Sequence, residues 1–120
     1  MDYKPNQIVV STGAKQSIAN VAQVLLNKGD EVLLPAPYWV SYSAIAILSE
    51  ATFVEIPSTI DTNFKITPEQ LEAAITPKTK MVFFNSPNNP SGSIFSQEEY
   101  RALAKVLEKH PQIFILSDEI

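Results

Sequence analysis

The 120-residue chain has no cysteine and only three glycines. Without cysteine, a disulfide scaffold, a thiolate metal site and a cysteine nucleophile are excluded, and the composition fits a reducing compartment. With so little glycine, the first strand-to-helix turn is neither a Walker A loop nor a dinucleotide-binding fingerprint. We therefore expect no metal site and no phosphate loop of these two standard types.

Positive charge is scarce as well. Lysine and arginine number 9 against 13 aspartates and glutamates, so the formal net charge is −4, and no basic run exists. This gives no electrostatic reason to expect nucleic acid or an anionic membrane as a partner. No apolar run approaches the ~20 residues of a membrane-spanning helix, and the N-terminus lacks a signal-peptide pattern. We expect a cytoplasmic protein that binds neither nucleic acid nor membrane.

What the chain does contain is an alternation of short apolar strands and amphipathic helices. The strands are predicted from apolar runs bounded by turn residues, at 8–12, 31–34, 52–56, 81–84 and 113–116. The helices are predicted from three- and four-residue apolar spacing, at 13–28, 39–48, 67–75 and from 96 onward. The last two helices begin with capping-box patterns, Thr67 to Gln70 and Ser96 to Glu99.

This order predicts an α/β fold: a parallel sheet of about five strands with helices on both faces. A chain of 120 residues is enough for one domain and too short for two. Its last residues directly follow a predicted core strand, and its first predicted strand begins close to Met1. We therefore expect residues 1–120 to be a single domain truncated at both ends.

Residues that carry chemistry follow the predicted strands, because ligands of open parallel sheets bind beyond the carboxyl ends of the strands. Gly13 and Ala14 form a strand-to-helix turn at which backbone N–H groups can approach an anion. Trp39 follows the second strand and can stack on a flat ring. Asn89 follows the fourth strand, where its amide can donate to a ring oxygen or a carboxylate. A tight turn, a covered sheet edge and a turn-former loop explain the same segments, and these alternatives stay open.

Asp118 directly follows the fifth strand and is expected to be at least partly buried. A buried carboxylate requires a cationic or hydrogen-bonding partner. The sequence offers no obvious partner within the chain, so we expect a ligand, such as a protonated heterocyclic nitrogen, or protein outside this chain; a structural cap of the next element is the alternative. His110 lies at a helix C-terminus, where the helix dipole explains it without a catalytic role.

Together, four segments resemble the fold-type I pyridoxal-phosphate-dependent aminotransferases, specifically the aspartate aminotransferase family, over about residues 8–120. The matching segments are Ser11-Thr12-Gly13-Ala14-Lys15-Gln16, Pro37-Tyr38-Trp39-Val40-Ser41-Tyr42, Ser86-Pro87-Asn88-Asn89-Pro90-Ser91-Gly92 and Ser117-Asp118-Glu119-Ile120. The resemblance implies a partial large domain that binds pyridoxal 5'-phosphate. It also implies that the backbone at Gly13, Ala14 and Lys15 holds the phosphate of this cofactor.

The resemblance assigns contacts to three further residues. Trp39 would stack on the pyridine ring, and Asn89 would donate to the phenolic oxygen of that ring. Trp39 and Asn89 would also contact the substrate, with Asn89 reaching its α-carboxylate. Asp118 would pair with the protonated pyridine nitrogen and keep the ring an electron sink.

The implied activity is amino-group transfer between an amino acid, by default aspartate, and a 2-oxo acid such as 2-oxoglutarate, in a homodimer. The family carries its Schiff-base lysine, a tyrosine and two arginines for the substrate carboxylate and the phosphate outside the segments matched here. We therefore expect no catalytic residue in this chain and no transamination by it alone. Other fold-type I enzymes (decarboxylase, lyase or synthase) and a stand-alone binding domain for a phosphorylated ligand remain alternatives.

The resemblance also implies a strand order. The predicted core is third, second, fourth, fifth, with the strand at 8–12 separated from the second. The edge of the fifth strand would then be left open, and open edges are templates for further pairing. We expect either the strand at 8–12 to pair with 113–116, or two chains to self-associate.

Overall fold

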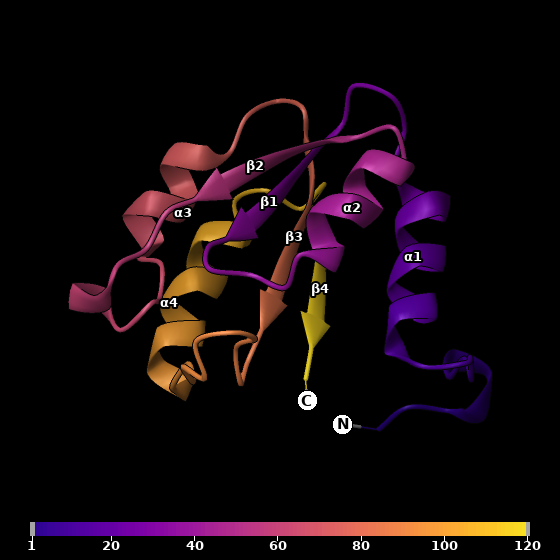
Figure 1. The fold of residues 1–120 in the computed structure, drawn as a ribbon, viewed down its shortest axis with the longest axis horizontal. Helices are drawn as coiled ribbons and strands as arrows, with labels where there is room; N and C mark the ends of the chain where they lie inside the picture. Colours follow the sequence, from indigo (N-terminus) through magenta and orange to yellow (C-terminus); the bar gives the residue numbers. More distant parts are fainter. Residues whose placement is uncertain (1, 120) are drawn as a thin grey trace.

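Four short parallel strands line up side by side in the order β2-β1-β3-β4. The computed structural model describes residues 2–119 (Figure 1). Its strands are β1 (Glu31–Pro35), β2 (Thr52–Ile56), β3 (Thr79–Asn85) and β4 (Phe114–Asp118). Its α-helices are α1 (Ala14–Leu25), α2 (Ser41–Leu48), α3 (Pro68–Ala74) and α4 (Gln97–Leu107), with short 3-10 helices η1 (Pro5–Gln7) and η2 (Ile60–Thr62).

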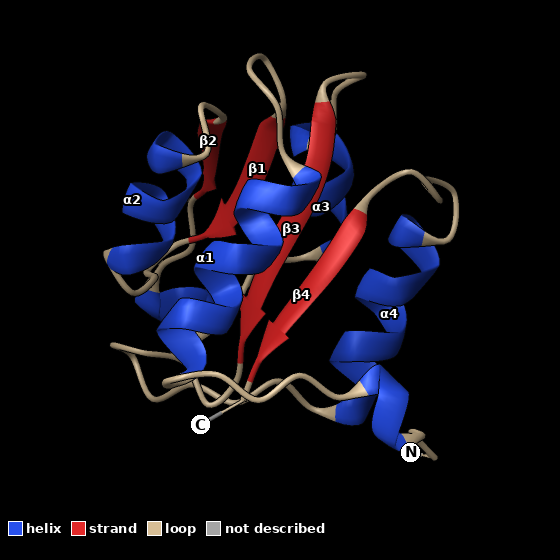
Figure 2. Ribbon diagram, turned by 90° about the vertical axis from the view of Figure 1, so that its right-hand side faces the viewer, coloured by secondary structure: helices blue, strands red, loops and turns tan. Residues whose placement is uncertain are grey.

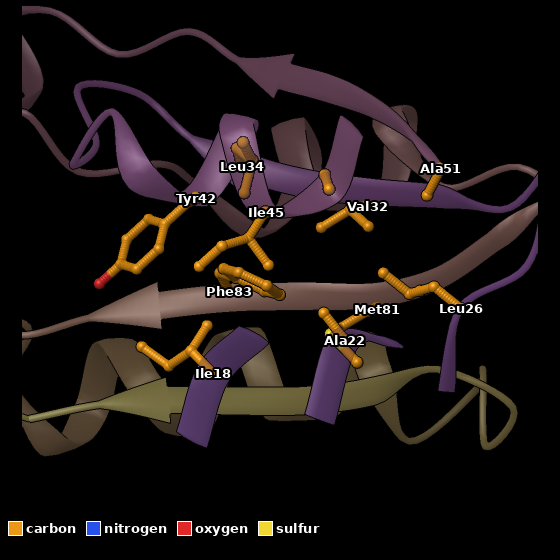
Figure 3. Packing of buried hydrophobic residues seen from close by; sticks show 11 residues of the cluster. Ile18, Ala22, Leu26, Val32, Leu34, Tyr42, Ile45, Ala51, Met81 and Phe83 are labelled. Carbon is orange, nitrogen blue, oxygen red and sulfur yellow. The ribbon is translucent and has the colours of Figure 1, made fainter. Parts of the chain in front are cut away.

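The sheet lies between two pairs of helices (Figure 2). Alternate residues of the central strands point to opposite faces, so Val32 and Leu34 pack with α1 and α2, whereas Leu33 packs with α3 and α4. Residues of β3 alternate in the same way. The result is two buried clusters, one on each face, and Figure 3 shows the cluster beneath α1 and α2. The predicted α/β architecture with helices on both faces is confirmed.

The strand order is also as predicted. The third, second, fourth and fifth predicted strands are β2, β1, β3 and β4, and they lie in that order. In the register of β3 and β4, Asn85 lies opposite Asp118. The carboxyl ends of these two strands are therefore level, which brings the segments that follow them to one place.

The predicted strand at 8–12 is wrong, and the sheet has four strands rather than about five. Residues 8–10 have no regular secondary structure, and the side chains of Ile8, Val9 and Val10 are 60%, 83% and 92% exposed. An apolar, β-branched run becomes a strand only when a neighbour supplies the hydrogen-bonding ladder. The described sheet gives this run no neighbour, since β4 pairs only with β3. Pairing of 8–12 with β4 therefore does not occur, and self-association stays a prediction.

The helix starts follow local sequence rules. The hydroxyl of Thr67 accepts a hydrogen bond from the Gln70 N–H (3.3 Å), and the Gln70 side chain accepts one from the Thr67 N–H (2.9 Å). Ser96 and Glu99 exchange the same two bonds at the start of α4. Both predicted capping boxes are thus confirmed. None of the helices within residues 2–119 has the length and apolar composition that crossing a bilayer requires.

Candidate functional site

A pocket of about 210 Å³ opens where α1 begins and where β4 ends. Its lining comes from segments far apart in the sequence: Ala14, Lys15, Trp39, Tyr42, Asn89 and Asp118. Five of these six residues were singled out from the sequence, and Gly13 directly precedes them on the chain. The structure therefore brings the predicted residues together at the carboxyl end of the sheet, as expected for an open parallel sheet.

The N-terminus of α1 forms one wall of this pocket. Gly13 is the N-cap residue, with φ 88° and ψ 158°, and no side chain caps the helix. A Cβ at Gly13 would meet open space, so the requirement for glycine comes from its backbone conformation. Within residues 2–119, the N–H groups of Ala14 and Lys15 donate to no side-chain acceptor. They are free to bind an anion, with the helix dipole in support.

Trp39 forms a second wall, on the segment between β1 and α2. Its half-buried indole is held edge-on against Tyr42, with ring centroids 5.6 Å apart. The Lys15 ammonium lies 4.6 Å from the centroid of the indole ring, a cation–π distance. Sequence reasoning used only the backbone of Lys15, but its side chain also lines the pocket. The pocket thus combines an aromatic face with a positive charge on a flexible side chain.

Asp118 has a partner within the chain, which corrects the expectation that none exists. The Tyr42 hydroxyl donates a hydrogen bond of 2.6 Å to Oδ2 of the half-buried Asp118 carboxylate. The Tyr42 ring is 2% exposed, and Figure 3 shows its hydroxyl pointing out of the core toward the carboxyl ends of β3 and β4. Burial raises the pKa of Tyr42 above its ordinary value, and the Asp118 carboxylate raises this pKa further. Tyr42 therefore stays a donor at neutral pH.

Sequence reasoning missed the Tyr42 contact. Tyr42 lies in the first turn of α2 and is 76 residues from Asp118 along the chain, so no local pattern indicated the bond. Within residues 2–119, no further hydrogen bond reaches the Asp118 carboxylate. One of its oxygens thus remains available to a bound molecule.

Asn89 lies on the loop that follows β3. Its side chain is exposed, and its backbone N–H donates to Oδ1 of the buried Asn85 (2.7 Å). Neighbouring Asn88 fixes the loop itself, since its amide donates to the Pro37 carbonyl (3.0 Å) and accepts from the Ser91 N–H (3.0 Å). The asparagine-rich loop is therefore anchored to the β1–α2 segment, and the Asn89 amide is left free to face the pocket.

The arrangement has a definite chemical character. It offers unpaired helix N–H groups for an anion, an indole face for a flat ring, an amide donor and a carboxylate for a cation. These groups fit a phosphorylated aromatic heterocycle whose ring nitrogen is protonated. No group of three or more histidine, aspartate or glutamate side chains within residues 2–119 is placed to hold a metal ion.

The chain is similar in sequence to known aminotransferases. The family model for class I and II aminotransferases matches residues 1–120. Aspartate/prephenate aminotransferase of Cereibacter sphaeroides is 50% identical over all 120 residues, and aspartate aminotransferase of Bacillus sp. (strain YM-2) is 48% identical. In both cases the chain covers 30% of the relative's length.

Solved structures of aspartate aminotransferases are similar to this chain in fold as well. The aspartate aminotransferase from Rhizobium meliloti superposes with a TM-score of 0.96 at 46% identity, over 98% of this chain and 30% of that one. The aspartate aminotransferase from Thermus thermophilus with maleate gives a TM-score of 0.89 at 39% identity, over 93% of this chain and 29% of that one. The chain spans about 30% of the length of the proteins it matches.

Proposed function

This chain belongs to the class I and II aminotransferase family, and we propose that it is part of the cofactor-binding domain of a longer, pyridoxal-phosphate-dependent aminotransferase. The observation that carries the proposal is the pocket in which the start of α1, the segment after β1, the loop after β3 and the end of β4 meet. Each of these contributes a group that the cofactor requires.

The cofactor contacts follow from the pocket wall. The N–H groups of Ala14 and Lys15, after the turn at Gly13, would hold the phosphate at the positive end of α1. Trp39 would lie against the ring, and Asn89 would donate to the phenolic oxygen. When bound, the cofactor supplies an electron sink for the carbanion that forms at the substrate's α-carbon.

Asp118 and Tyr42 would act together on the ring nitrogen. The negative charge of Asp118 favours a proton on that nitrogen, because an adjacent opposite charge stabilises the charged form of an acid–base group. Tyr42 donates to the carboxylate and fixes its orientation. Because the pKa of Tyr42 is raised by burial and by Asp118, its hydroxyl keeps this proton at working pH.

The proposed substrates are an amino acid with a second carboxylate and a 2-oxo acid. Relatives are named for aspartate and prephenate, and the Thermus thermophilus structure is described with maleate. The ammonium group of Lys15 and the amide of Asn89 both lie on the pocket wall. Both are suited to a carboxylate, and the ring of Trp39 would bound the substrate on one side. We take aspartate with 2-oxoglutarate as the first pair to test.

Assembly and location complete the proposal. We propose that the complete protein is a cytoplasmic homodimer, and that residues 1–120 form one truncated domain of it. Size-exclusion chromatography with light scattering tests the dimer. Fractionation of cells that express the protein tests the location.

The test of the function is direct. The complete protein that carries this chain should bind pyridoxal 5'-phosphate and form oxaloacetate from aspartate and 2-oxoglutarate, measured by coupling to malate dehydrogenase. A second assay, with prephenate in place of 2-oxoglutarate, separates the two relatives' named activities. A protein that binds the cofactor but releases carbon dioxide from its amino acid substrate would be a decarboxylase and would contradict the proposal.

A further inference from the structure

We propose that Asn85 is a positioning residue that sets the spacing between Asn89 and Asp118, a role that rests on the function proposed above. Asn85 is the last residue of β3 and lies outside the pocket wall. Its two amide ends bind one neighbour each, and those neighbours are the two residues proposed to contact the ring nitrogen and the phenolic oxygen of the cofactor. The inference is that one side chain holds both contacts in register.

The Asn85 side chain bridges Asn89 and Asp118 through two hydrogen bonds. The Asn85 side-chain nitrogen donates to the backbone carbonyl of Asp118 (2.9 Å). Its side-chain oxygen accepts from the backbone N–H of Asn89 (2.7 Å). In the register of the sheet, Asn85 lies directly opposite Asp118. Asn85 is 6% exposed, so water does not replace these bonds easily.

The chemistry of the amide makes the bridge directional. A carboxamide has one acceptor end and one donor end in a rigid plane. The Asp118 carbonyl requires a donor, and the Asn89 N–H requires an acceptor. A flipped amide would place oxygen against oxygen and N–H against N–H, so only one orientation satisfies both neighbours. Aspartate or leucine, which resemble asparagine in shape, would each lose at least one of the two bonds.

The position of the bridge matters for the proposed reaction. Asp118 would act at the ring nitrogen and Asn89 at the phenolic oxygen and the substrate carboxylate, so their separation must match the ring. The loop after β3 is anchored elsewhere by Asn88 to Pro37, on the β1 side. Toward β4, the loop start is tied by Asn85 and by the longer bond from the Ser86 N–H to the Asp118 carbonyl (3.3 Å). Removing Asn85 would therefore let Asn89 move relative to Asp118.

A purely structural role is the competing explanation, because Asn85 also ends the ladder between β3 and β4. Thr79 provides a matched control at the other end of β3. It is 2% exposed, and its hydroxyl accepts a hydrogen bond from the Thr76 N–H (2.9 Å). Thr79 is not among the residues that line the pocket. Asn85→Ala and Thr79→Val thus each remove a buried polar group from the same strand, and only one of the two removes the bridge.

The experiment uses the complete protein carrying each variant. We would measure the thermal unfolding of the cofactor-free protein, the Kd for pyridoxal 5'-phosphate by calorimetry, and kcat and KM for aspartate. Both variants should unfold at lower temperature. Only Asn85→Ala should raise the cofactor Kd about tenfold, as expected when a positioned contact equivalent to one net hydrogen bond is lost. Its kcat should fall by up to about 100-fold if the misplacement nears 1 Å.

A double-mutant cycle sharpens the result. If Asn85 acts through Asn89, then Asn85→Ala should weaken cofactor binding less in an Asn89→Ala background than in the wild type. Thr79→Val should be additive with Asn89→Ala. Asn85→Ser serves if the alanine variant does not fold: its hydroxyl can keep one bond of the two, and an intermediate Kd is expected.

The outcomes are separable. If Asn85→Ala and Asn85→Ser lower only the unfolding temperature, as Thr79→Val does, or are additive with Asn89→Ala, the positioning role is overturned while the proposed function stands. If the wild-type protein binds no pyridoxal 5'-phosphate, the proposed function itself fails. A raised Kd and a coupled cycle for Asn85, beside an unchanged Kd for Thr79→Val, support the inference.

Discussion

The two faces of the sheet are built in different ways. On one face, α3 and α4 both begin with a capping box in which side chains satisfy the first N–H groups. On the other face, neither α1 nor α2 has a side-chain cap at its N-terminus. Figure 1 shows these two pairs of helices on opposite sides of the sheet. The capped face also carries ion pairs, from Lys65 to Glu99 (2.5 Å) and from Lys109 to Glu72 (2.8 Å).

If the pocket has the proposed function, this difference divides residues 2–119 into a face that serves stability and a face that serves binding. A capped helix start has its orphan N–H groups occupied and cannot offer them to a ligand. An uncapped start costs stability but leaves a ready site for an anion. The uncapped start of α1 lines the pocket with Ala14 and Lys15, and α2 contributes Tyr42. We therefore expect changes on the α1/α2 face to alter cofactor binding and activity first, and changes on the α3/α4 face to alter stability alone.

The largest effect is expected for Asp118→Ala in the complete protein. Removing this carboxylate would remove the proposed counter-charge of the ring nitrogen, so transaminase kcat should fall by at least about 100-fold, comparable to the loss of one preorganised electrostatic contact. Much of the cofactor should remain bound through the other contacts. Steady-state kinetics and cofactor content measure the two quantities. Asp61→Ala, an exposed aspartate of η2 near α3, is the control and should leave both unchanged.

Near-normal turnover by the Asp118→Ala enzyme would defeat the assignment of this residue. Equal loss of activity in the Asp61→Ala enzyme would defeat the comparison of the two faces. These outcomes are independent of each other. They test the role of the site and the division of the molecule separately.

A smaller effect is expected for Tyr42→Phe. The ring still packs edge-on against Phe83 (centroids 5.2 Å apart), but the hydrogen bond to Asp118 is lost. We expect kcat/KM to fall about tenfold, the size of one hydrogen bond to a charged group. A wild-type value for this variant would show that Asp118 needs no partner within the chain.

Alkaline unfolding gives Tyr42→Phe a second, independent readout. Because the folded-state pKa of Tyr42 is raised by burial and by Asp118, the unfolded protein loses this proton at lower pH than the folded protein does. Wild-type stability should therefore fall as pH rises above about 10, the ordinary tyrosine pKa. The phenylalanine ring of the variant cannot ionise, so the free-energy difference between wild type and variant should shrink toward high pH. A constant difference in urea unfolding between about pH 9 and about pH 11 would contradict this linkage.

Local features of the fold were predictable from the sequence. The capping boxes at Thr67 and Ser96 depend on residues three apart, and both form as predicted. Strand pairing is not local, and for this reason the run at Ile8 to Thr12 was predicted wrongly. Its β-branched composition favours a strand, but the composition carries no information on whether a partner exists.

The features of the site also divide into those that the sequence indicates and those that depend on non-local packing. Trp39, Asn89 and Asp118 could be singled out because each follows a strand, and the carboxyl ends of parallel strands gather at one edge. Their cofactor contacts are implied by the family resemblance and stay a prediction. The bond from Tyr42 to Asp118 spans 76 residues and depends on how α2, which packs against β1 and β2, carries the Tyr42 ring past Phe83 of β3. The Asn85 bridge depends on the register of two strands. Such contacts are set by packing and register, which a single sequence does not display.

On the capped face, Ser96→Ala should change stability and nothing else. The Ser96 hydroxyl accepts from the Glu99 N–H (3.2 Å), and losing an N-cap bond of this kind costs about 1 kcal/mol. Chemical unfolding of the cofactor-free protein measures the cost. Ser96→Thr is the matched control, because threonine retains the capping hydroxyl. A change in the Kd for pyridoxal 5'-phosphate in the alanine variant would show that the two faces are not separate.

The smallest effect is expected at Glu72, which joins α3 to α4 on the exposed surface. Its carboxylate accepts from Lys109 (2.8 Å) and lies 3.1 Å from the His110 ring nitrogen. Lys109 first, and His110 second, hold the pKa of Glu72 below its ordinary value of 4.5.

A carboxyl group with a lowered folded-state pKa stabilises the fold above its unfolded pKa, and this contribution disappears as pH falls through the folded value. The advantage of wild type over Glu72→Gln should therefore be greatest near neutral pH and vanish in acid. Because the ion pair is exposed, added salt should also reduce the stability advantage of wild type over Glu72→Gln. This advantage should be smaller than the stability lost in Ser96→Ala. Thermal unfolding from neutral to acid pH, with Glu108→Gln on the same surface as control, measures the trend. An advantage that grows toward acid pH would mean that Glu72 is not held ionised by these two neighbours.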